Sequence, residues 1–437
     1  MYLPPQVEFC IAALEKAGFA TYAVGGCVRD ACLGLTPHDY DLCTAATPAQ
    51  ICEVFADFSL VKAGEKHGTV GVVLDGEVFE ITTFRTEGSY TDSRHPDWVE
   101  FVTDIEKDLA RRDFTVNAMA YSPTRGFADP FGGQADLQNK ILRAVGDPRQ
   151  RFTEDALRIL RGVRFAVKYS LTPDRETLDA MLDLSHRLKN IAAERIFDEL
   201  CKLLPLIRAE QLCTFSPILC QVIPQLAPTV GFDQKNPHHA YDIFTHIAHV
   251  VEAVPQELTL RWAALLHDIG KPQTFTLDDT GKGHFYGHAD TSAQMADGIL
   301  RQLKAPNSLR EDVVALISRH MTTLEPEKKA MRRWLSRLGP KMLRQLLALQ
   351  EADMGSKGTG LQEESAQFAQ LRTVLAEIEA ENACLQLKDL AVDGHDLMAL
   401  GYTGPAIGKA LNALLEQVID EQLPNEKEAL LEAANSQ

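Results

Sequence analysis

The sequence of 437 residues predicts an α+β protein, with the strands concentrated near the N-terminus and an all-helical remainder. Two observations support this fold class. Between residues 21 and 84, short apolar runs of strand length are separated by turn signals such as Asp75-Gly76. From about residue 207 onward, apolar residues recur at helical spacing. A chain of this length allows about three domains.

The first strand is expected at residues 21–24, which end in Gly25-Gly26. A short helical stretch and a turn follow, and a second strand is expected to carry Asp39 and Asp41. Alternate residues of a strand project from one face, so the two carboxylates should point the same way. Paired carboxylates suit Mg²⁺, and a Gly-Gly turn before a helix lets a phosphate approach the backbone. The stretch predicts a site for metal-assisted nucleotidyl transfer.

Further strands are expected after a helix that begins at Thr47-Pro48. The runs GTVGVVL and EVFEITTF read as a hairpin that turns at Asp75-Gly76. Glu80 is either a third carboxylate beside the aspartate pair or an exposed strand residue. Residues 85–98 are polar and lack periodicity, so they predict a mobile loop beside the site.

Basic residues follow this loop. The adjacent pair Arg111-Arg112 is either solvated or forms forked hydrogen bonds to triphosphate and ribose oxygens. Further along, Thr153 is expected to cap a helix on which Asp155 and Arg158 lie three residues apart. Those two side chains either serve a ligand or form an intrahelical salt bridge.

Taken together, the motifs resemble those of class II tRNA nucleotidyltransferases, the CCA-adding enzymes, whose head belongs to the DNA polymerase β superfamily. The resemblance covers roughly residues 20–205 and rests on motifs that occur in the family's order: Val24-Gly25-Gly26, Arg29-Asp30, Asp39-Tyr40-Asp41, EITTFR, Arg111-Arg112-Asp113-Phe114, Asn117-Ala118, DPFGG, RFTEDALRILR and AAERIFDEL.

The resemblance implies a polymerase β-like head with a small mixed sheet (1–145), an all-α neck (146–205), a helical body (206–360) and a helical tail (361–437). It also implies that Asp39 and Asp41 bind Mg²⁺ and activate a primer hydroxyl, and that Asp155 and Arg158 read the incoming base. The residues expected to bind nucleotide are Gly25, Gly26, Arg29, Arg111, Arg112, Asp113, Asn117, Asp155, Arg158, Arg161 and Arg164.

A second constellation occurs in the helical part, around the sequence LLHDIGKP. Its members fall at separations typical of successive helices, and imidazole with carboxylate suits a transition metal such as Ni²⁺, Mn²⁺, Fe²⁺ or Co²⁺. The stretch resembles the HD metal-dependent phosphohydrolase superfamily. The expected ligands are His246, His267, Asp268 and Asp353, with His288 and His320 for a second ion.

Charge and composition restrict the partners. A net charge of -17 argues by itself against a nucleic-acid partner, but its distribution is uneven. Residues 325–345 contain seven basic and two acidic residues, whereas residues 351–437 contain five basic and sixteen acidic ones. The basic run is either a solvated helix face or a phosphate-contacting helix. Nine cysteines without CxxC pairs favour a reducing cytoplasm, and no apolar run is long enough to span a membrane.

The function expected from these features is addition of CMP, CMP and AMP to a tRNA 3′ end from CTP and ATP, with release of diphosphate and an additional HD phosphohydrolase activity. Three alternatives stay open. They are a poly(A) polymerase, a partial CC- or A-adding enzyme, and an HD phosphohydrolase whose head only binds nucleotide.

Overall fold

The computed structural model describes residues 1–88, 99–237, 239–358, 362–381 and 383–436. The chain divides into two compact units, Met1–Ile207 with Thr214–Pro224, and Arg208–Cys213 with Gln225–Gln437. The first unit contains the ranges expected for head and neck, and the second contains most of the expected body and tail. The finer division into four regions stays a prediction.

The first unit is built on a mixed seven-stranded sheet in the order β3-β4-β5-β2-β1-β8-β9. Only the β2–β5 pair is parallel among these neighbours. Asp75 and Gly76 both have positive φ at the β4–β5 turn, which confirms the predicted hairpin. The strands are β1 (Thr21–Val24), β2 (Asp41–Thr44), β3 (Leu60–Val61), β4 (Thr69–Leu74), β5 (Glu77–Thr83), β8 (Ala120–Ser122) and β9 (Gly126–Ala128).

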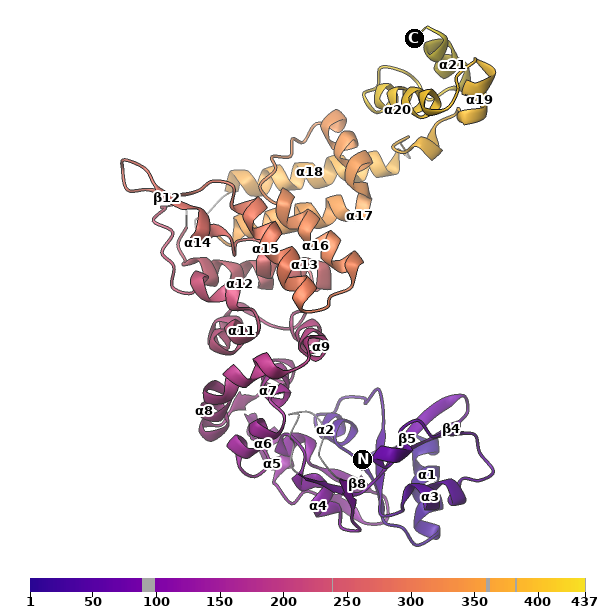
Figure 1. Ribbon diagram of the computed structural model, residues 1–437, viewed down its shortest axis with the longest axis vertical. Helices are drawn as coiled ribbons and strands as arrows, with labels where there is room; N and C mark the ends of the chain where they lie inside the picture. The colour runs from indigo at the N-terminus through magenta and orange to yellow at the C-terminus, as the bar shows by residue number, and fades with distance from the viewer. Residues whose placement is uncertain (89–98, 238, 359–361, 382, 437) are drawn as a thin grey trace. The chain divides into compact units, whose positions relative to one another are not determined.

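Helices α1 (Pro5–Lys16) and α3 (Pro48–Val54) pack on each other and against strands of this sheet (Figure 1). The predicted start of α3 is confirmed, because Thr47 and Gln50 form a capping box and Pro48 occupies the first turn. Helix α2 (Gly26–Cys32) follows β1 directly. Between β5 and β8 lie the short strands β6 (Arg85–Glu87) and β7 (Val99–Phe101), which pair with each other, and helix α4 (Ile105–Ala110). Residues 89–98 of the predicted loop lie outside the described residues.

The rest of the first unit is mainly helical, apart from the short parallel pair β10 (Ile141–Leu142) and β11 (Thr172–Pro173). Its helices are α5 (Gly133–Gln138), α6 (Pro148–Glu154), α7 (Leu157–Tyr169), α8 (Arg175–Leu184), α9 (Ala193–Leu203) and α11 (Ser216–Val222). Phe114 attaches α7 to the sheet-bearing part through an edge contact with Phe165, with ring centroids 5.9 Å apart. Gly162 makes this close approach possible, since a Cβ there would lie 2.9 Å from the Phe114 ring.

The second unit is mainly helical, with its core around the fully buried Trp262. A hairpin, β12 (Phe275–Leu277) with β13 (Gly283–Phe285), interrupts the expected all-helical pattern. The turn of this hairpin includes Gly281 at positive φ, and glycine is a turn signal in the sequence. The helical periodicity on either side obscured that signal. The helices are α12 (Ile243–Ala253), α13 (Leu258–Leu266), α14 (Lys271–Thr274), α15 (His288–Gln302), α16 (Asn307–Arg319), α17 (Lys328–Gly355) and α18 (Gln362–Ala380).

The end of the second unit has a small core of its own, formed by α19 (Gly394–Ala399), α20 (Pro405–Ile419) and α21 (Lys427–Asn435) around Leu397, Leu414 and Leu430. No described helix is long and apolar enough to cross a membrane.

Acidic residues of the C-terminal part neutralise much of the basic run on α17. Arg333 lies 2.6 Å from Asp420, and Arg332 lies 2.7 Å from Glu381. Arg344, which follows the non-helical kink of α17 at Gly339, lies 2.6 Å from Glu379 on α18. The run is therefore neither a simply solvated face nor an open phosphate site, because the chain supplies many of its counterions.

Candidate functional sites

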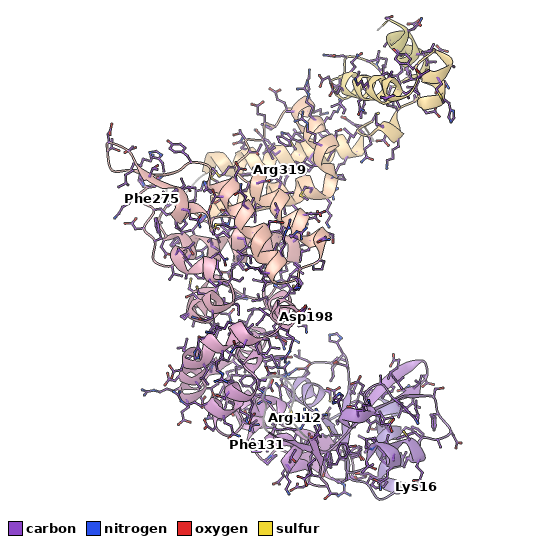
Figure 2. The ribbon with its side chains drawn as sticks, viewed as in Figure 1. Lys16, Arg112, Phe131, Asp198, Phe275 and Arg319 are labelled. Atoms are coloured by element: carbon purple, nitrogen blue, oxygen red, sulfur yellow. The ribbon has the colours of Figure 1, made fainter. Side chains whose placement is uncertain are left out.

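A cavity of about 490 Å³ in the first unit collects most of the predicted nucleotide-binding residues. Figure 2 labels one of them, Arg112. Of the predicted set, Glu80 and Arg164 are not among the lining residues. Those that line it are Gly25, Gly26, Arg29, Asp39, Asp41, Arg111, Arg112, Asp113, Asn117, Asp155, Arg158 and Arg161. Sequence reasoning missed Arg195, which also lines this cavity.

Two carboxylates, Asp39 and Asp41, line the cavity, and a third, Glu80, lies near Asp41 outside the lining. Asp41 is the first residue of β2, whereas Asp39 precedes the strand, so the expectation of one strand carrying both is wrong. The β2–β5 register pairs Leu42 with Ile81, which places Glu80 opposite Asp41. Burial and the charges of Asp39 and Glu80 raise the pKa of Asp41, although Arg112 acts in the opposite sense. This excess of negative charge is suited to a divalent cation.

The Gly-Gly turn brings backbone and arginine together. Gly25 has φ 71° and ψ -119° and precedes α2. A Cβ at this position would lie 2.7 Å from Arg112 Nη1, so a larger residue would displace that guanidinium. The turn thus leaves backbone amides and an arginine on the same side of the cavity.

The two adjacent arginines share a buried partner that sequence reasoning missed. Arg111 Nη2 lies 2.9 Å from Asp108 Oδ1, and Arg112 Nη2 lies 3.4 Å from Asp108 Oδ2. Burial opposes ionisation of Asp108, but the two guanidinium groups outweigh it and lower its pKa. Asp108 therefore orients both arginines. The spacing of three and four residues from Asp108, across the end of α4, was the available signal.

Arg29 ties α2 to α7. Its Nη2 donates to Tyr169 Oη at 2.5 Å, its Nη1 donates to Asn117 Oδ1, and its Nε donates to Asp30 Oδ1 at 2.8 Å. The guanidinium carbon also lies 4.3 Å from the centroid of the Tyr169 ring. Each nitrogen of Arg29 thus has a protein partner. Arg29 therefore contributes to the cavity by holding α2 and α7 in position.

Asp155 and Arg158 do not lie on one continuous helix, which corrects the prediction. Helix α6 begins after the Asp147 cap and ends at Glu154, and Asp155 is extended with φ -141° and ψ 104°. Thr153 therefore lies inside α6. Asp147-Pro148 combines a capping side chain with Pro in the first turn, and this start signal lies six residues earlier.

The intrahelical pairing of Asp155 with Arg158 is also wrong. Asp155 Oδ1 accepts the backbone N–H of Leu157 at 3.0 Å, and Arg195 Nη2 lies 2.7 Å from Asp155 Oδ2. Arg158 Nη1 instead donates to Glu154 Oε2 at 2.8 Å. Both side chains still line the same cavity, each with its own partner on the protein.

Asp113 anchors a network beneath the cavity. Its Oδ2 lies 2.8 Å from Arg161 Nη2, and its Oδ1 accepts from Asn117 at 3.0 Å. Burial alone would raise the pKa of Asp113, but Arg161 and Asn117 lower it to about 2. Arg164, which does not line the cavity, lies 2.6 Å from Glu199. These contacts join the segment after α4 to α7 and α9.

Replacing Asp113 by Asn should destabilise the first unit by about 2 kcal/mol at pH 7, since a pKa unit corresponds to about 1.4 kcal/mol. A depressed carboxyl pKa stabilises the fold above the unfolded value near 4, and this contribution is lost as pH falls toward 2. Denaturant unfolding of both proteins at pH 7 and pH 3 measures it. The difference between them should shrink at the lower pH, and a constant difference would contradict the assignment.

The second unit brings all six residues of the predicted metal cluster together. His246 lies on α12, His267 and Asp268 follow α13, and Asp353 lies near the end of α17. The members are His246, His267, Asp268, His288, His320 and Asp353, and all are buried.

The ring orientations in this cluster suit metal ligation. The Nδ1 atoms of His267, His288 and His320 lie 2.7 to 2.8 Å from backbone carbonyl oxygens of their own segments. With Nδ1–H donated to a carbonyl, the Nε2 atom keeps its lone pair. These three Nε2 atoms are buried without hydrogen-bond partners among the described residues. Unpaired buried lone pairs are costly unless a cation satisfies them.

The cluster contains two overlapping groups centred on Asp268. The possible ligand atoms of His246, His267 and Asp268 lie within 4.8 Å of one another, and so do those of Asp268, His288 and His320. Asp353 Oδ1 lies 2.9 Å from His246 Nε2 and 3.8 Å from His267 Nε2.

Local charge supports the same interpretation. Lys271 Nζ lies 2.7 Å from Asp268 Oδ2. Burial opposes ionisation of Asp268, but His267 and Lys271 hold its pKa well below the usual range. Burial lowers the pKa of His320 to about 4, so its ring is neutral at pH 7, the form that binds metal.

The sheet and the carboxylate-edged cavity define the first unit as a nucleotidyltransferase head, and the Poly A polymerase head domain matches residues 21–143. A second domain of tRNA nucleotidyltransferases matches residues 284–434. Over 439 residues the chain is 34% identical to the CCA-adding enzyme of Levilactobacillus brevis, covering 99% of this chain and 98% of that protein. The chain belongs to the CCA-adding enzyme family.

Solved structures agree with this placement. A CCA-adding enzyme of Bacillus stearothermophilus in complex with CTP is 27% identical, covers 100% of this chain and 98% of its own, and superposes with a TM-score of 0.73. The Thermotoga maritima CCA-adding enzyme complexed with tRNA has the same fold, with 20% identity, coverage of 99% and 96%, and a TM-score of 0.59.

Proposed function

We propose that this protein adds CMP, CMP and AMP to the 3′ end of tRNA, using CTP and ATP and releasing diphosphate. The observation that carries the proposal is that one cavity is lined both by Asp39 and Asp41 and by the polar side chains of Asp155 and Arg158. Family membership and the relatives solved with CTP and with tRNA support it. The free state of all nine cysteines fits the reducing cytoplasm where such a reaction would occur.

The proposed reaction is in-line attack of the RNA 3′-hydroxyl on the α-phosphorus. The oxygen–phosphorus bond forms while the bond from the α-phosphorus to diphosphate breaks. Asp39 and Asp41, with Glu80 beside them, would hold Mg²⁺, which when bound neutralises phosphate charge and favours ionisation of the hydroxyl. Arg111 and Arg112, oriented by Asp108, contact the triphosphate.

Base selection is assigned to fixed side chains in place of a template. Asp155 presents a carboxylate acceptor, and Arg158 presents guanidinium donors. Asp155 is held by Arg195 and Arg158 is held by Glu154, so each enters the cavity from a defined position. Cytosine and adenine both carry an exocyclic amino group, and a carboxylate oxygen can accept a hydrogen bond from its N–H.

The proposal is tested with tRNA that lacks its 3′ terminus, incubated with CTP, with ATP and with both, and followed by sequencing of the products. Addition of C, C and A in order is the expected result. Continued addition of A would indicate a poly(A) polymerase, and arrest after CC or a requirement for a CC end would indicate a partial enzyme.

In the same assay, Asp155→Ala or Arg158→Ala should weaken discrimination against UTP and GTP by roughly 10- to 100-fold, since an unpaired buried polar group costs about 1–3 kcal/mol. Lys168→Ala is the matched control, because it removes a charge from an exposed position of α7. If both variants reject UTP as the unmodified protein does, the two residues have no template role.

We further propose that the His/Asp cluster of the second unit binds a transition metal (Ni²⁺, Mn²⁺, Fe²⁺ or Co²⁺) and hydrolyses 2′,3′-cyclic phosphates or phosphomonoesters. The buried, unpaired Nε2 atoms support this second function. In the reaction, the oxygen of water bonds to phosphorus, one ester P–O bond breaks, and a proton from water goes to the departing oxygen. The bound metal would supply the hydroxide at neutral pH.

A further inference from the structure

Helix α17 carries a row of basic side chains that the proposed reactions do not use. Lys329, Arg333 and Arg337 follow one another at four-residue spacing, so they lie on one face of the helix, before its kink at Gly339. We propose that this basic row binds backbone phosphates of RNA, and that Asp420 of α20 covers part of it until RNA displaces the carboxylate. The inference rests on tRNA as the substrate of the proposed addition reaction.

A single carboxylate neutralises two of the three basic side chains. Asp420 Oδ2 lies 2.6 Å from Arg333 Nη2 and 3.3 Å from Lys329 Nζ, and Arg333 Nε donates to Asp420 Oδ1 at 2.8 Å. Arg333 thus holds the carboxylate through two nitrogens, which is the fork geometry that a guanidinium also uses on phosphate. Asp420 therefore occupies the basic row as a phosphate group would.

Arg337 is the uncovered member of the basic row. Its side chain is exposed, and it has no ion-pair partner among the residues that the structure describes. Arg337 lines a cavity of about 420 Å³ that it shares with Arg333, Ser336, Asn412 and the acidic Glu416. The guanidinium, hydroxyl and amide groups of this cavity can all donate hydrogen bonds to phosphate oxygens. RNA can therefore contact the row at Arg337 while Asp420 is still in place.

The covering ion pairs are weak enough for RNA to replace them. The side chains of Arg333 and Lys329 are 51% and 46% exposed. Exposed ion pairs contribute little to stability and weaken with salt. An RNA strand offers several phosphates at once and releases condensed counterions when they are neutralised, a gain that one carboxylate does not provide. Small anions lack most of this gain, so Asp420 should make the basic row selective for RNA.

The test measures the Kd of tRNA that lacks its 3′ terminus, at several salt concentrations and without CTP or ATP. Asp420→Asn keeps the shape of the side chain and should bind this tRNA about fivefold more tightly, the upper range for release of an exposed ion pair. Glu428→Gln is the matched control, because it removes one negative charge from an exposed position of α21. It should change the Kd far less. Thermal melting establishes that both variants are folded.

Arg337→Ala should have the opposite effect. It should bind the tRNA about fivefold more weakly, and the slope of log Kd against log salt should fall by about one, as expected for one lost phosphate contact. In a Lys329→Ala/Arg333→Ala background, Asp420→Asn should have no larger effect than the control, because the side chains that it covers are absent. A fivefold gain that persists in that background would indicate general repulsion of RNA and would overturn the covering role.

This inference and the proposed addition reaction fail in different ways. If Asp420→Asn binds as Glu428→Gln does, or Arg337→Ala binds as the unmodified protein does, the inference is wrong, whatever the addition assay shows. If all variants bind as expected but the unmodified protein adds no nucleotides, only the addition proposal is wrong. If the unmodified protein does not bind tRNA, both are wrong.

Discussion

Replacing Asp41 by Asn is expected to abolish nucleotide addition while the fold and tRNA binding are retained. Asp41 is the first residue of a central strand, lies opposite Glu80 and lines the cavity that contains the arginines. An amide cannot supply the negative charge that holds a divalent ion. Loss of that ion's charge neutralisation should cost several kcal/mol in the transition state, roughly a thousandfold or more in rate.

The stability of this variant provides an independent check. The pKa of Asp41 is raised by burial and by the neighbouring carboxylates, so its ionised form is disfavoured in the fold without metal. Asp41→Asn should therefore melt no lower than the unmodified protein when Mg²⁺ is absent. Asp75→Asn, on the exposed β4–β5 turn, is the matched control for addition. Near-normal addition by Asp41→Asn would refute the catalytic assignment.

The second large effect is expected in the second unit. The double variant His267→Ala/Asp268→Ala should lose its transition metal and its phosphohydrolase activity, because Asp268 belongs to both groups of possible ligands. Nucleotide addition should stay nearly unchanged, since the addition cavity is built from the first unit alone. Metal content by mass spectrometry and the two activity assays measure these outcomes.

Two further variants distinguish the loss of a metal ligand from a folding defect. Asp268→Asn keeps the shape of the buried side chain and should also lose metal. His249→Ala, on the same helix as His246 but outside the cluster, should retain it. Unchanged metal content in the double variant would refute the ligand assignment. Equal loss of both activities in a folded protein would refute the separation of the sites.

Some elements of the fold could be predicted from the sequence because they depend on local signals. The β4–β5 hairpin follows from Asp75-Gly76, and the start of α3 follows from Thr47-Pro48. The six residues predicted as metal ligands lie together in the structure, and their signal in the sequence is that histidine and aspartate recur at helix-length separations in an apolar context.

Other features depend on contacts between distant segments and could not be predicted in this way. The pairing of Asp155 with Arg195 joins residues forty positions apart, and it accompanies a break between α6 and α7 where a continuous helix was expected. Asp108 was overlooked because its role depends on burial beneath the arginine pair.

The link from Arg29 to Tyr169 has a mechanical consequence. Helix α7 begins next to Asp155, carries Arg158 and ends at Tyr169, which holds the guanidinium of a residue in α2. Helix α2 in turn starts at the Gly25-Gly26 turn. In the proposed reaction, a tilt of α7 on a change of base would be transmitted through Arg29 to the Gly25-Gly26 turn. The residues proposed to read the base and the turn proposed to bind the phosphates are therefore mechanically coupled through a single side chain.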